Sequence, residues 1–397
     1  MKRMRLKERF LNSRIVKRIG DIGVVVGGAT PSTKVKHYWD GRIPWLSPKD
    51  LTGYKKRYIS RGGKCITEDG LKSCSTQLVP AGTVLFSSRA PIGYVAIAKQ
   101  PLCTNQGFKS VVPNDNVDGL FLYYLLKEKR GYIESQGSGT TFKEVSAAVM
   151  KSIELEIPES VEEQRKIAAV LDAIDSKIEL NDQINDYLAK LGEVIVSKAC
   201  CTADGILGDI CCQVSDKETC ENASIETYVS TESLLENKDG RQIASSIPTS
   251  GKVTRYRKGD TLVSNVRPYF KKICYSSEEG TCSGDVLVFR ANDASYAPYL
   301  YFCLYQDSFF NHMMQGAKGT KMPRGDKKQI MEYAIAKSCD KESLRVLSAA
   351  TELIAKNSSE SNYLARLRDA LLPRLMSGEI DVSRLDITQL NNHLSDC

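Results

Sequence analysis

The sequence predicts an α+β protein in which two duplicated α/β domains are joined by two long antiparallel coiled-coil helices about a pseudo-two-fold axis. Two observations predict this fold class. A set of β-prone segments occurs twice along the 397 residues, and a long segment with helical periodicity follows each occurrence. Matching positions such as Asn181 and Asn357 are 176 residues apart, whereas solenoid repeats recur every ~20–50 residues. The repeat therefore indicates a duplicated domain.

Four segments carry the repeat, and they occur in the same order in both copies. In the first copy they are AGTVLFSSRAPIG from Ala81, NQGFKSVVP from Asn105, QGSGTTF from Gln136 and EEQRKIAAVLDAID from Glu162. In the second copy they are KGDTLVSNVRPYFK from Lys258, SGDVLVF from Ser283, QGAKGTK from Gln315 and ESLRVLSAATELIA from Glu342. Two similar sites are expected from two similar domains.

The first domain is expected over residues 1–157, and it is β-rich from about residue 14 onward. Gly, Pro and Asn separate short β-prone runs, which is typical of strands joined by turns. Helical spacing from Phe121 predicts one helix with the sequence FLYYLLKEKRGYIES. The expected strands are RIPWL, TVLFSS, GYVAIA and FKSVV.

A first long helix is expected over residues 158–202. Pro158 is a residue type that favours the start of a helix. Acidic residues follow in the expected first turn, where the helix dipole favours negative charge. The apolar positions then alternate steps of four and three, the spacing of a coiled-coil seam. These positions are Ile167, Leu171, Ile174 and Ile178.

The second domain is expected over residues 203–338, with TLVSNV and DVLVFRA as strands and one helix, YLYFCLYQDSFFNHMMQ, from Tyr299. A second long helix follows at 339–380, and residues 381–397 form a C-terminal tail. Asn357 takes the place in the second helix that Asn181 has in the first. Polar residues at a seam fix the register of paired helices. The matched asparagines therefore favour pairing of the two helices over two helices that each pack on their own domain.

The charge of the chain is concentrated in its first part. Residues 1–157 hold 26 Lys and Arg against 13 Asp and Glu, an excess of 13, while the whole chain carries +7. An excess of basic residues is typical of proteins that bind a polyanion by neutralising its phosphates. In the first domain we expect this role for a basic stretch interleaved with aromatic residues, namely Lys34, Lys36, Lys49, Lys55, Lys56, Arg57 and Arg61.

The second domain is balanced in charge, but its basic residues cluster. Arg255, Arg257, Arg267, Lys271, Lys318 and Lys321 are the candidate binding residues there. Arg89 in the first copy and Arg267 in the second occupy matching places beside a proline. Each can either clamp a phosphate or base edge, or form a salt bridge that fixes the turn.

The sequence offers no catalytic or metal site. It lacks a phosphate-binding loop of the G-x-x-x-x-G-K-[ST] type, and its three histidines stand apart from any nucleophile. The cysteines near the junction of the halves, Cys200, Cys201, Cys211, Cys212 and Cys220, lack zinc-knuckle spacing and are expected to be thiols. We expect no membrane segment, no signal peptide and a cytoplasmic location.

The chain resembles the specificity subunit of type I restriction–modification systems over essentially its whole length. The resemblance is carried by YWDGRIPWLSPKDL from Tyr38, GTVLFSSRAPIG from Gly82, TNQGF from Thr104, the QGSGTTF turn, IPESVEEQRKIAAVLDAID from Ile157 and LLPRLMSGEIDV from Leu371. The second copy lacks YWDGRIPW and the EEQ of the helix start, so the resemblance is weaker there.

The resemblance implies a non-catalytic DNA-binding subunit that serves DNA methylation and host defence. Each domain, called a target recognition domain in that family, reads one half of a split sequence, and the paired helices set the unread gap. Two methyltransferase subunits and motor-nuclease restriction subunits are the implied partners, and S-adenosylmethionine, ATP and Mg²⁺ would act on those partners, with no cofactor in this chain. The alternatives are a stand-alone DNA-binding regulator and the recognition half of a fused restriction enzyme.

Overall fold

A computed structural model describes residues 13–139, 143–199 and 203–386. The chain divides into two compact units, which are Met1–Glu179 with Tyr363–Cys397, and Leu180–Asn362. Each long helix contributes one part to each unit. In the described residues, no helix has the length and apolar character needed to cross a membrane.

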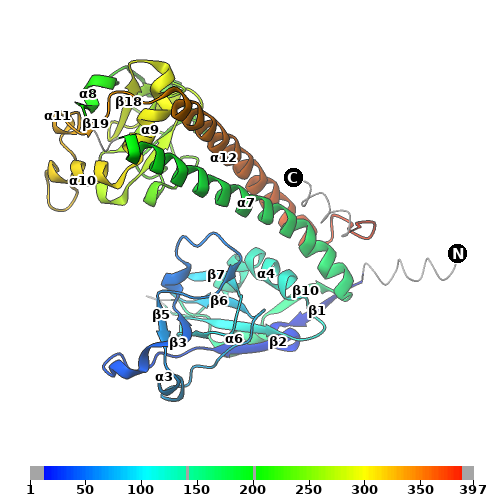
Figure 1. Cartoon of the computed structure of the whole chain (residues 1–397). Coiled ribbons are helices and arrows are strands. Elements are labelled where there is room, and N and C mark those ends of the chain that lie inside the picture. The colour runs from blue at the N-terminus through cyan, green and yellow to red at the C-terminus, as the bar shows by residue number, and fades with distance from the viewer. Residues whose placement is uncertain (1–12, 140–142, 200–202, 387–397) are drawn as a thin grey trace. The chain divides into compact units, whose positions relative to one another are not determined.

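A five-stranded sheet with the strand order β2-β9-β6-β7-β4 lies in the first unit. Figure 1 labels its strands β2, β6 and β7. All neighbours are antiparallel except β4, which runs parallel to β7. β6 is buried along its whole length because the sheet is covered on both faces at its middle. The bounds are β2 Gly23–Gly27, β9 Lys109–Pro113, β6 Val84–Ser88, β7 Ile92–Ala98 and β4 Tyr58–Ile59.

Smaller sheets and short helices complete this unit. A three-stranded sheet has the order β5-β3-β8, and β1 pairs with β10. Helix α4 packs on β6 and β7, and its buried Tyr124 reaches the first part of α7. The bounds are β1 Arg14–Arg18, α2 Ile19–Ile22, β3 Trp39–Leu46, β5 Lys64–Ile66, α3 Glu68–Lys72, β8 Cys103–Thr104, α4 Gly119–Glu128, α5 Arg130–Ser135, α6 Ala147–Ser152 and β10 Glu154–Pro158, with 3-10 turns η1 Lys36–Tyr38 and η2 Pro48–Leu51.

The second unit repeats this plan. Its main sheet has the order β12-β18-β15-β16, a three-stranded sheet has the order β13-β14-β17, and β11 pairs with β19. The bounds are β11 Gly205–Ile206, α8 Leu207–Ile210, β12 Cys211–Gln213, β13 Lys217–Thr219, η4 Cys220–Asn222, η5 Glu236–Lys238, β14 Lys252–Tyr256, β15 Thr261–Ser264, η6 Pro268–Phe270, β16 Ile273–Tyr275, β17 Gly280–Cys282, β18 Val286–Ala291, η7 Ala294–Tyr296, α9 Ala297–Tyr305, α10 Asp307–Gln315, α11 Lys327–Ile330 and β19 Ala334–Ile335.

The duplication extends to single hydrogen bonds, which confirms the predicted fold class. The order β2-β9-β6-β7 corresponds to β12-β18-β15-β16. The one-turn helices α2 and α8 have the sequences IGDI and LGDI, a repeat that the sequence analysis missed. After each of them, an asparagine amide donates to the carbonyl oxygen of the aspartate in that turn, Asn114 to Asp21 and Asn292 to Asp209.

The helix that was predicted in each domain is instead a pair of helices. In the first copy α4 ends at Glu128 and α5 begins at Arg130, and in the second α9 ends at Tyr305 and α10 begins at Asp307. The backbone leaves the helical region between them, at Lys129 (ψ 6) and at Gln306 (ψ 143). Apolar spacing continues across both breaks, because both members of each pair face the same core.

The long helices are α7 Val161–Ala199 and α12 Lys341–Met376, and they run antiparallel within each unit. In the first unit Ile167 and Leu171 share a core with Leu372 and Leu375. In the second unit Val196 shares a core with Leu347 and Ala350. Residue numbers rise along one helix as they fall along its partner, as expected for the antiparallel helices of the predicted fold class.

Buried polar residues join the two helices where the prediction placed them. In the second unit Asn181 is 1% exposed, and its amide donates to Glu360 Oε2 at 2.8 Å. Asn357 is also buried, and it donates to Asn185 Oδ1 at 2.9 Å. Each seam asparagine therefore bonds across to the opposite helix, which selects one register because a slip of one turn would leave buried amides unpaired.

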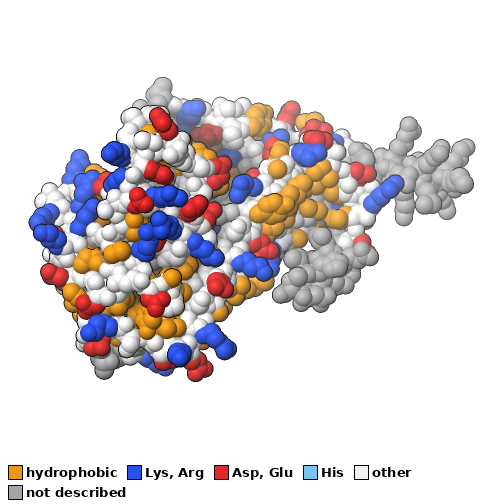
Figure 2. Space-filling view, turned by 90° about the horizontal axis from the view of Figure 1, so that it is seen from above, with side chains coloured by type: hydrophobic (Ala, Val, Ile, Leu, Met, Phe, Trp, Pro, Cys, Tyr) orange, Lys and Arg blue, Asp and Glu red, His pale blue; other side chains and the backbone are white. Residues whose placement is uncertain are grey.

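Apolar side chains remain exposed on the long helices. On the part of α7 in the second unit these are Leu180, Tyr187, Leu191 and Val194, of which Tyr187 is 69% exposed. Figure 2 shows hydrophobic side chains gathered over the long helices. A pair of helices can bury one stripe on each, so further apolar positions stay open to a partner.

Candidate nucleic-acid interface

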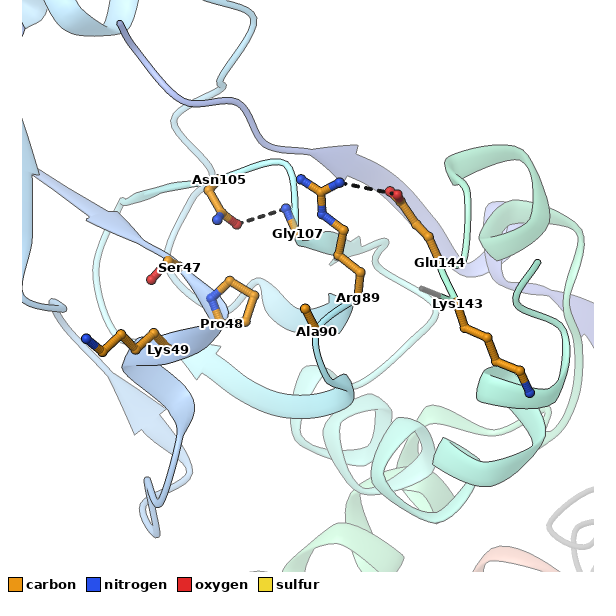
Figure 3. Close-up of a pocket in the computed structure, with 9 residues that line it drawn as sticks. All are labelled: Ser47, Pro48, Lys49, Arg89, Ala90, Asn105, Gly107, Lys143 and Glu144. Atoms are coloured by element: carbon orange, nitrogen blue, oxygen red, sulfur yellow. Dashed lines mark hydrogen bonds and ion pairs between the residues drawn. The ribbon is translucent and has the colours of Figure 1, made fainter. Parts of the chain in front are cut away.

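A pocket of about 550 Å³ lies in the first unit beside the turn between β6 and β7. It is lined by Ser47, Pro48, Lys49, Arg89, Ala90, Asn105, Gly107, Lys143 and Glu144. These residues come from four separate segments of the chain, so only the fold brings them together. Lys49 and Lys143 extend in opposite directions from its rim (Figure 3), which gives the mouth positive charge on two sides.

Ion pairs between charged side chains line one wall of this pocket. Arg89 Nη1 lies 3.5 Å from Glu144 Oε2, and Lys109 Nζ lies 3.4 Å from the other oxygen, Oε1. Both the Arg89 and Glu144 side chains are more than a third exposed, so solvent screens their pair. Because a weak pair breaks easily, Arg89 remains available to a phosphate or a base edge.

The opposite wall is shaped by a tight turn. Asn105 Oδ1 accepts a hydrogen bond from Gly107 N at 2.8 Å, the geometry of an Asx turn. A Cβ atom at Gly107 would lie 2.9 Å from Pro48 Cγ, so a side chain there would push the turn away from Pro48. The glycine in the NQGF segment therefore permits the close approach that forms the pocket.

The structure brings two of the predicted first-domain residues, Lys49 and Arg89, to this pocket. Apart from Arg57, the others lie elsewhere on the surface of the same unit, in the segment before β3, after η2 and after β4. All of the following are exposed: Lys34, Lys36, Lys55, Lys56 and Arg61. Trp45 is core, since it is 6% exposed and its indole Nε1 donates to Ala29 O at 2.9 Å.

Arg57 differs from its expected role, because its guanidinium is buried against α7 instead of facing solvent. Arg57 is 6% exposed, and its Nε donates to Glu179 Oε1 at 3.1 Å. Its other nitrogens bond Asp172 and Ser176 Oγ. Burial alone would lower the pKa of Arg57, but the hydrogen bond and charge of Glu179 and the charge of Asp172 raise it. Arg57 is therefore a structural anchor between a basic loop and the helix.

A second buried pair continues this anchor across the helices of the first unit. Asp175 Oδ2 accepts a hydrogen bond from Tyr124 Oη at 2.8 Å, and Asp175 Oδ1 forms an ion pair with Arg368 Nη1 at 2.7 Å. Burial, together with the nearby charge of Asp175, raises the pKa of Tyr124, so its hydroxyl stays protonated. The three side chains join α4, α7 and α12.

In the second unit three of the six predicted basic residues have acidic partners. Arg255 pairs with Glu279 at 3.4 Å, Lys271 with Asp307 at 2.8 Å and Lys318 with Asp326 at 3.2 Å. Arg257 precedes β15 and Arg267 follows it, so these two residues lie at opposite ends of that strand. Lys321 is exposed in the loop that follows α10.

The loops QGSGTTF and QGAKGTK are closed in the same way. Two backbone hydrogen bonds join Ser138 to Glu144 in the first copy, and two join Lys318 to Arg324 in the second. The TTF residues 140–142 lie outside the described residues. Three residues of this site were not predicted from the sequence. Lys109 lies within the NQGFKS segment, and Lys143 and Glu144 directly follow TTF.

The described cysteines from the junction do not form a metal centre. Cys211, Cys212 and Cys220 are free thiols, and burial raises the pKa of Cys211 to about 12. Within the described ranges no group of three or more His, Cys, Asp or Glu residues is placed to hold a metal ion. Cys200 and Cys201 lie outside those ranges.

The fold defines a class of protein with two copies of one α/β domain, each followed by a long helix. Residues 15–190 match the family model of the type I restriction modification DNA specificity domain. The match covers the first domain and most of the first long helix.

Individual relatives also match part of the chain. The chain is 52% identical over 178 residues to the type I restriction enzyme MjaIX specificity subunit of Methanocaldococcus jannaschii, which covers 44% of this chain and 41% of that protein. It is 29% identical over 167 residues to the EcoR124I/EcoR124II specificity subunit of Escherichia coli, covering 40% of each. The matched part therefore spans about two-fifths of the length of these curated relatives.

The fold of nearly the whole chain has a solved counterpart. The type I restriction–modification S subunit from M. genitalium superposes with a TM-score of 0.57 over 91% of this chain and 96% of that one, at 16% identity. At that identity the likeness shows a shared fold alone. It includes the second copy, which the family model does not reach.

Proposed function

We propose that this chain is the sequence-specific DNA-recognition subunit of a type I restriction–modification complex and that it catalyses no reaction itself. The observation that carries the proposal is the duplication: two sheets share an order of four strands, and the first of them lies in the part of the chain that matches the DNA specificity family model. Two diverged copies suit a target in two parts. Residues 1–157 and 203–338 act as the two target recognition domains.

The basic residues of each domain contact the phosphate backbone and the bases. In the first domain the exposed Lys34, Lys36, Lys49, Lys55, Lys56 and Arg61 neutralise phosphates. Arg89 lies at the pocket, where it can exchange its screened bond to Glu144 for a guanine edge or a phosphate. In the second domain Arg255, Arg257, Arg267, Lys271, Lys318 and Lys321 serve in this way. Binding through phosphates weakens steeply as salt rises.

The long helices fix the unread gap and dock the partners. The buried seam at Asn181 and Asn357 holds one register, so helix length sets the spacing of the two half-sites. The exposed apolar residues of α7 offer a surface for two methyltransferase subunits. Motor-nuclease subunits join that assembly, and S-adenosylmethionine, ATP and Mg²⁺ act on the partner subunits.

Methylation mapping tests the proposal. The chain is expressed with its cognate methyltransferase subunit in a host that lacks DNA methylation, and the modified positions are sequenced. We expect one motif with two specified halves and a constant unspecified gap. Methylation that is independent of this chain, or a continuous motif without a gap, would contradict the proposal.

A further inference from the structure

The hairpin between β15 and β16 differs from its counterpart in the first copy. In the first copy β6 and β7 are joined by residues 89–91, whereas β15 and β16 are joined by residues 265–272. The strands on either side match in sheet order. The two copies therefore share the scaffold of this hairpin and differ at its tip, which is where readers of two different half-sites are expected to diverge.

The backbone of the longer tip is bent at two positions. Arg267 (φ 52, ψ 64) and Lys271 (φ 50, ψ 50) both adopt the left-handed conformation, which non-glycine residues rarely adopt. Such conformations persist where surrounding structure enforces them, and they concentrate at functional sites. Here Arg267 N donates to Pro323 O at 2.8 Å, and Lys271 Nζ pairs with Asp307 Oδ2 at 2.8 Å.

Between these two bends the tip presents an aromatic ring to solvent. Tyr269 is 49% exposed, and its ring rests on that of Phe270 with centroids 4.7 Å apart. Lys272 Nζ lies 5.8 Å from the Phe270 centroid and donates to Thr231 O, which holds the supporting ring. The Tyr269 ring is thus exposed to solvent and supported by the Phe270 ring, instead of being packed into the core.

The surroundings of Tyr269 are basic. The Arg267 guanidinium has no side-chain partner among the described residues, and its Nε is buried without a hydrogen bond. The adjoining loop, closed by Lys318 and Arg324, carries the exposed Lys321 and Met322, the latter 46% exposed. The exposed Tyr269 and Met322 thus lie near two cations that have no ion partner among the described residues, Arg267 and Lys321. Cations beside apolar groups suit a nucleic acid, whose phosphates are negatively charged and whose base edges include apolar groups.

We propose that the turn Arg267–Lys271 is a base-reading element of the second domain and that Tyr269 is a specificity-determining residue in it. Tyr269 makes an apolar contact with a base of double-stranded DNA, such as a thymine methyl group, and Arg267 holds the flanking phosphate or base edge. The inference rests on the proposed function, whose target has two halves, and it assigns this turn to the second.

The test uses the assembled methyltransferase, with the wild-type chain, Tyr269→Ala and Tyr269→Phe. Methylation rates are measured on duplexes that carry single base changes throughout the mapped motif. For Tyr269→Ala we expect discrimination at one position of the second half-site to fall about tenfold, with the first half-site unchanged. Tyr269→Phe keeps the ring, so discrimination should stay within about twofold of the wild type.

Tyr132→Ala is the matched control, because Tyr132 has almost the same exposure (47%) and lies on α5 of the first unit. It should leave both half-sites unchanged. If Tyr269→Ala keeps full discrimination, or weakens only assembly with the methyltransferase subunit, the turn does not read bases and the inference is wrong. A wild-type complex without a two-part motif would refute the proposed function itself, so the two failures are distinguishable.

Discussion

The two copies hold the same loop in the same place with ion pairs of opposite polarity. In the first copy the loop contributes the carboxylate of Glu144, and its cationic partners are Arg89, in the turn after β6, and Lys109 on β9. In the second copy the loop contributes the cation, Arg324, whose guanidinium donates two hydrogen bonds of 3.0 Å to Asp285 beside the sheet. The position of the loop has therefore been kept while the residues that hold it have changed. Such freedom suits a surface that must read different sequences on a common scaffold.

The copies also differ in how a loop cation is fixed to α7. Arg57 of the first unit is buried and bonded to three side chains of that helix. In the second unit Lys238 reaches Glu193 of α7 at 2.7 Å and Asp307 at 2.8 Å. The first anchor is a planar guanidinium with fixed geometry and the second is a flexible ammonium, so the first loop should be the more rigidly held.

The largest expected effect comes from breaking the Arg57 anchor. Arg57→Met leaves Asp172 and Glu179 without their cation, and losing one partner of a buried pair costs about 3 kcal/mol. Partial exposure of the two acids places the result toward the lower end of the usual range. Urea or thermal unfolding of the first unit measures it. The exposed neighbour Arg61→Met is the control, with an expected change below about 0.5 kcal/mol. Equal effects of both changes would remove the distinction between anchor and binding residue.

A second prediction concerns DNA affinity. Reversing Lys49 and Lys56 to Glu should weaken DNA binding by the assembled methyltransferase at least tenfold and flatten its salt dependence, since two phosphate contacts are lost. Filter binding or anisotropy across a salt series measures both quantities. Lys17→Glu, an exposed change on β1, should have little effect. An unchanged salt slope in the double reversal would show that the basic stretch does not contact phosphates.

A third prediction, with a smaller expected effect, concerns the ion pair between Arg324 and Asp285 in the second copy. Asp285→Ala and Arg324→Ala should each lower the melting temperature slightly, and the double variant should lower it no further than the larger single change. Non-additivity of this kind is the signature of two groups that act through each other. Simple addition of the two shifts would mean that the bonds between them do not hold the loop.

The smallest effect is a dependence of stability on pH in the second unit. Hydrogen bonds from Lys238 and Lys271 lower the pKa of Asp307 below its usual value. A carboxyl with a lowered pKa stabilises the fold fully above about pH 4 and loses that contribution as pH falls through its folded value. The stability difference between wild type and Asp307→Asn should therefore be constant from pH 7 to about pH 4 and shrink below it. A difference independent of pH would contradict this.

Periodic and repeated features could be predicted from the sequence, and tertiary pairings could not. The strands TVLFSS and FKSVV and both long helices were predicted because local alternation and seam spacing reflect burial directly. The buried state of Arg57 was missed because its partners lie more than a hundred residues away, and a basic run looks the same whether or not one member turns inward. The breaks after Glu128 and Tyr305 were missed because apolar spacing does not report backbone angles.

The candidate site was predictable in part for a similar reason. Arg89 stood out by its repeat at Arg267, whereas Lys143 and Glu144 reach the pocket only through the closure of their loop. Tyr269 could not be singled out from the sequence, because its significance lies in its exposure and in the left-handed backbone on both sides of it.

The claim that two copies read two half-sites at a separation set by the helices has one direct test. Four residues, the length of a coiled-coil stutter, are inserted into α7 beside Asn181, with and without a matching insertion into α12 beside Ser361. The assembled methyltransferase is then used to map methylation. We expect both half-sequences to be retained and the gap between them to lengthen. An active, assembled variant that keeps the original gap, or that changes the bases within a half-site, would contradict the claim.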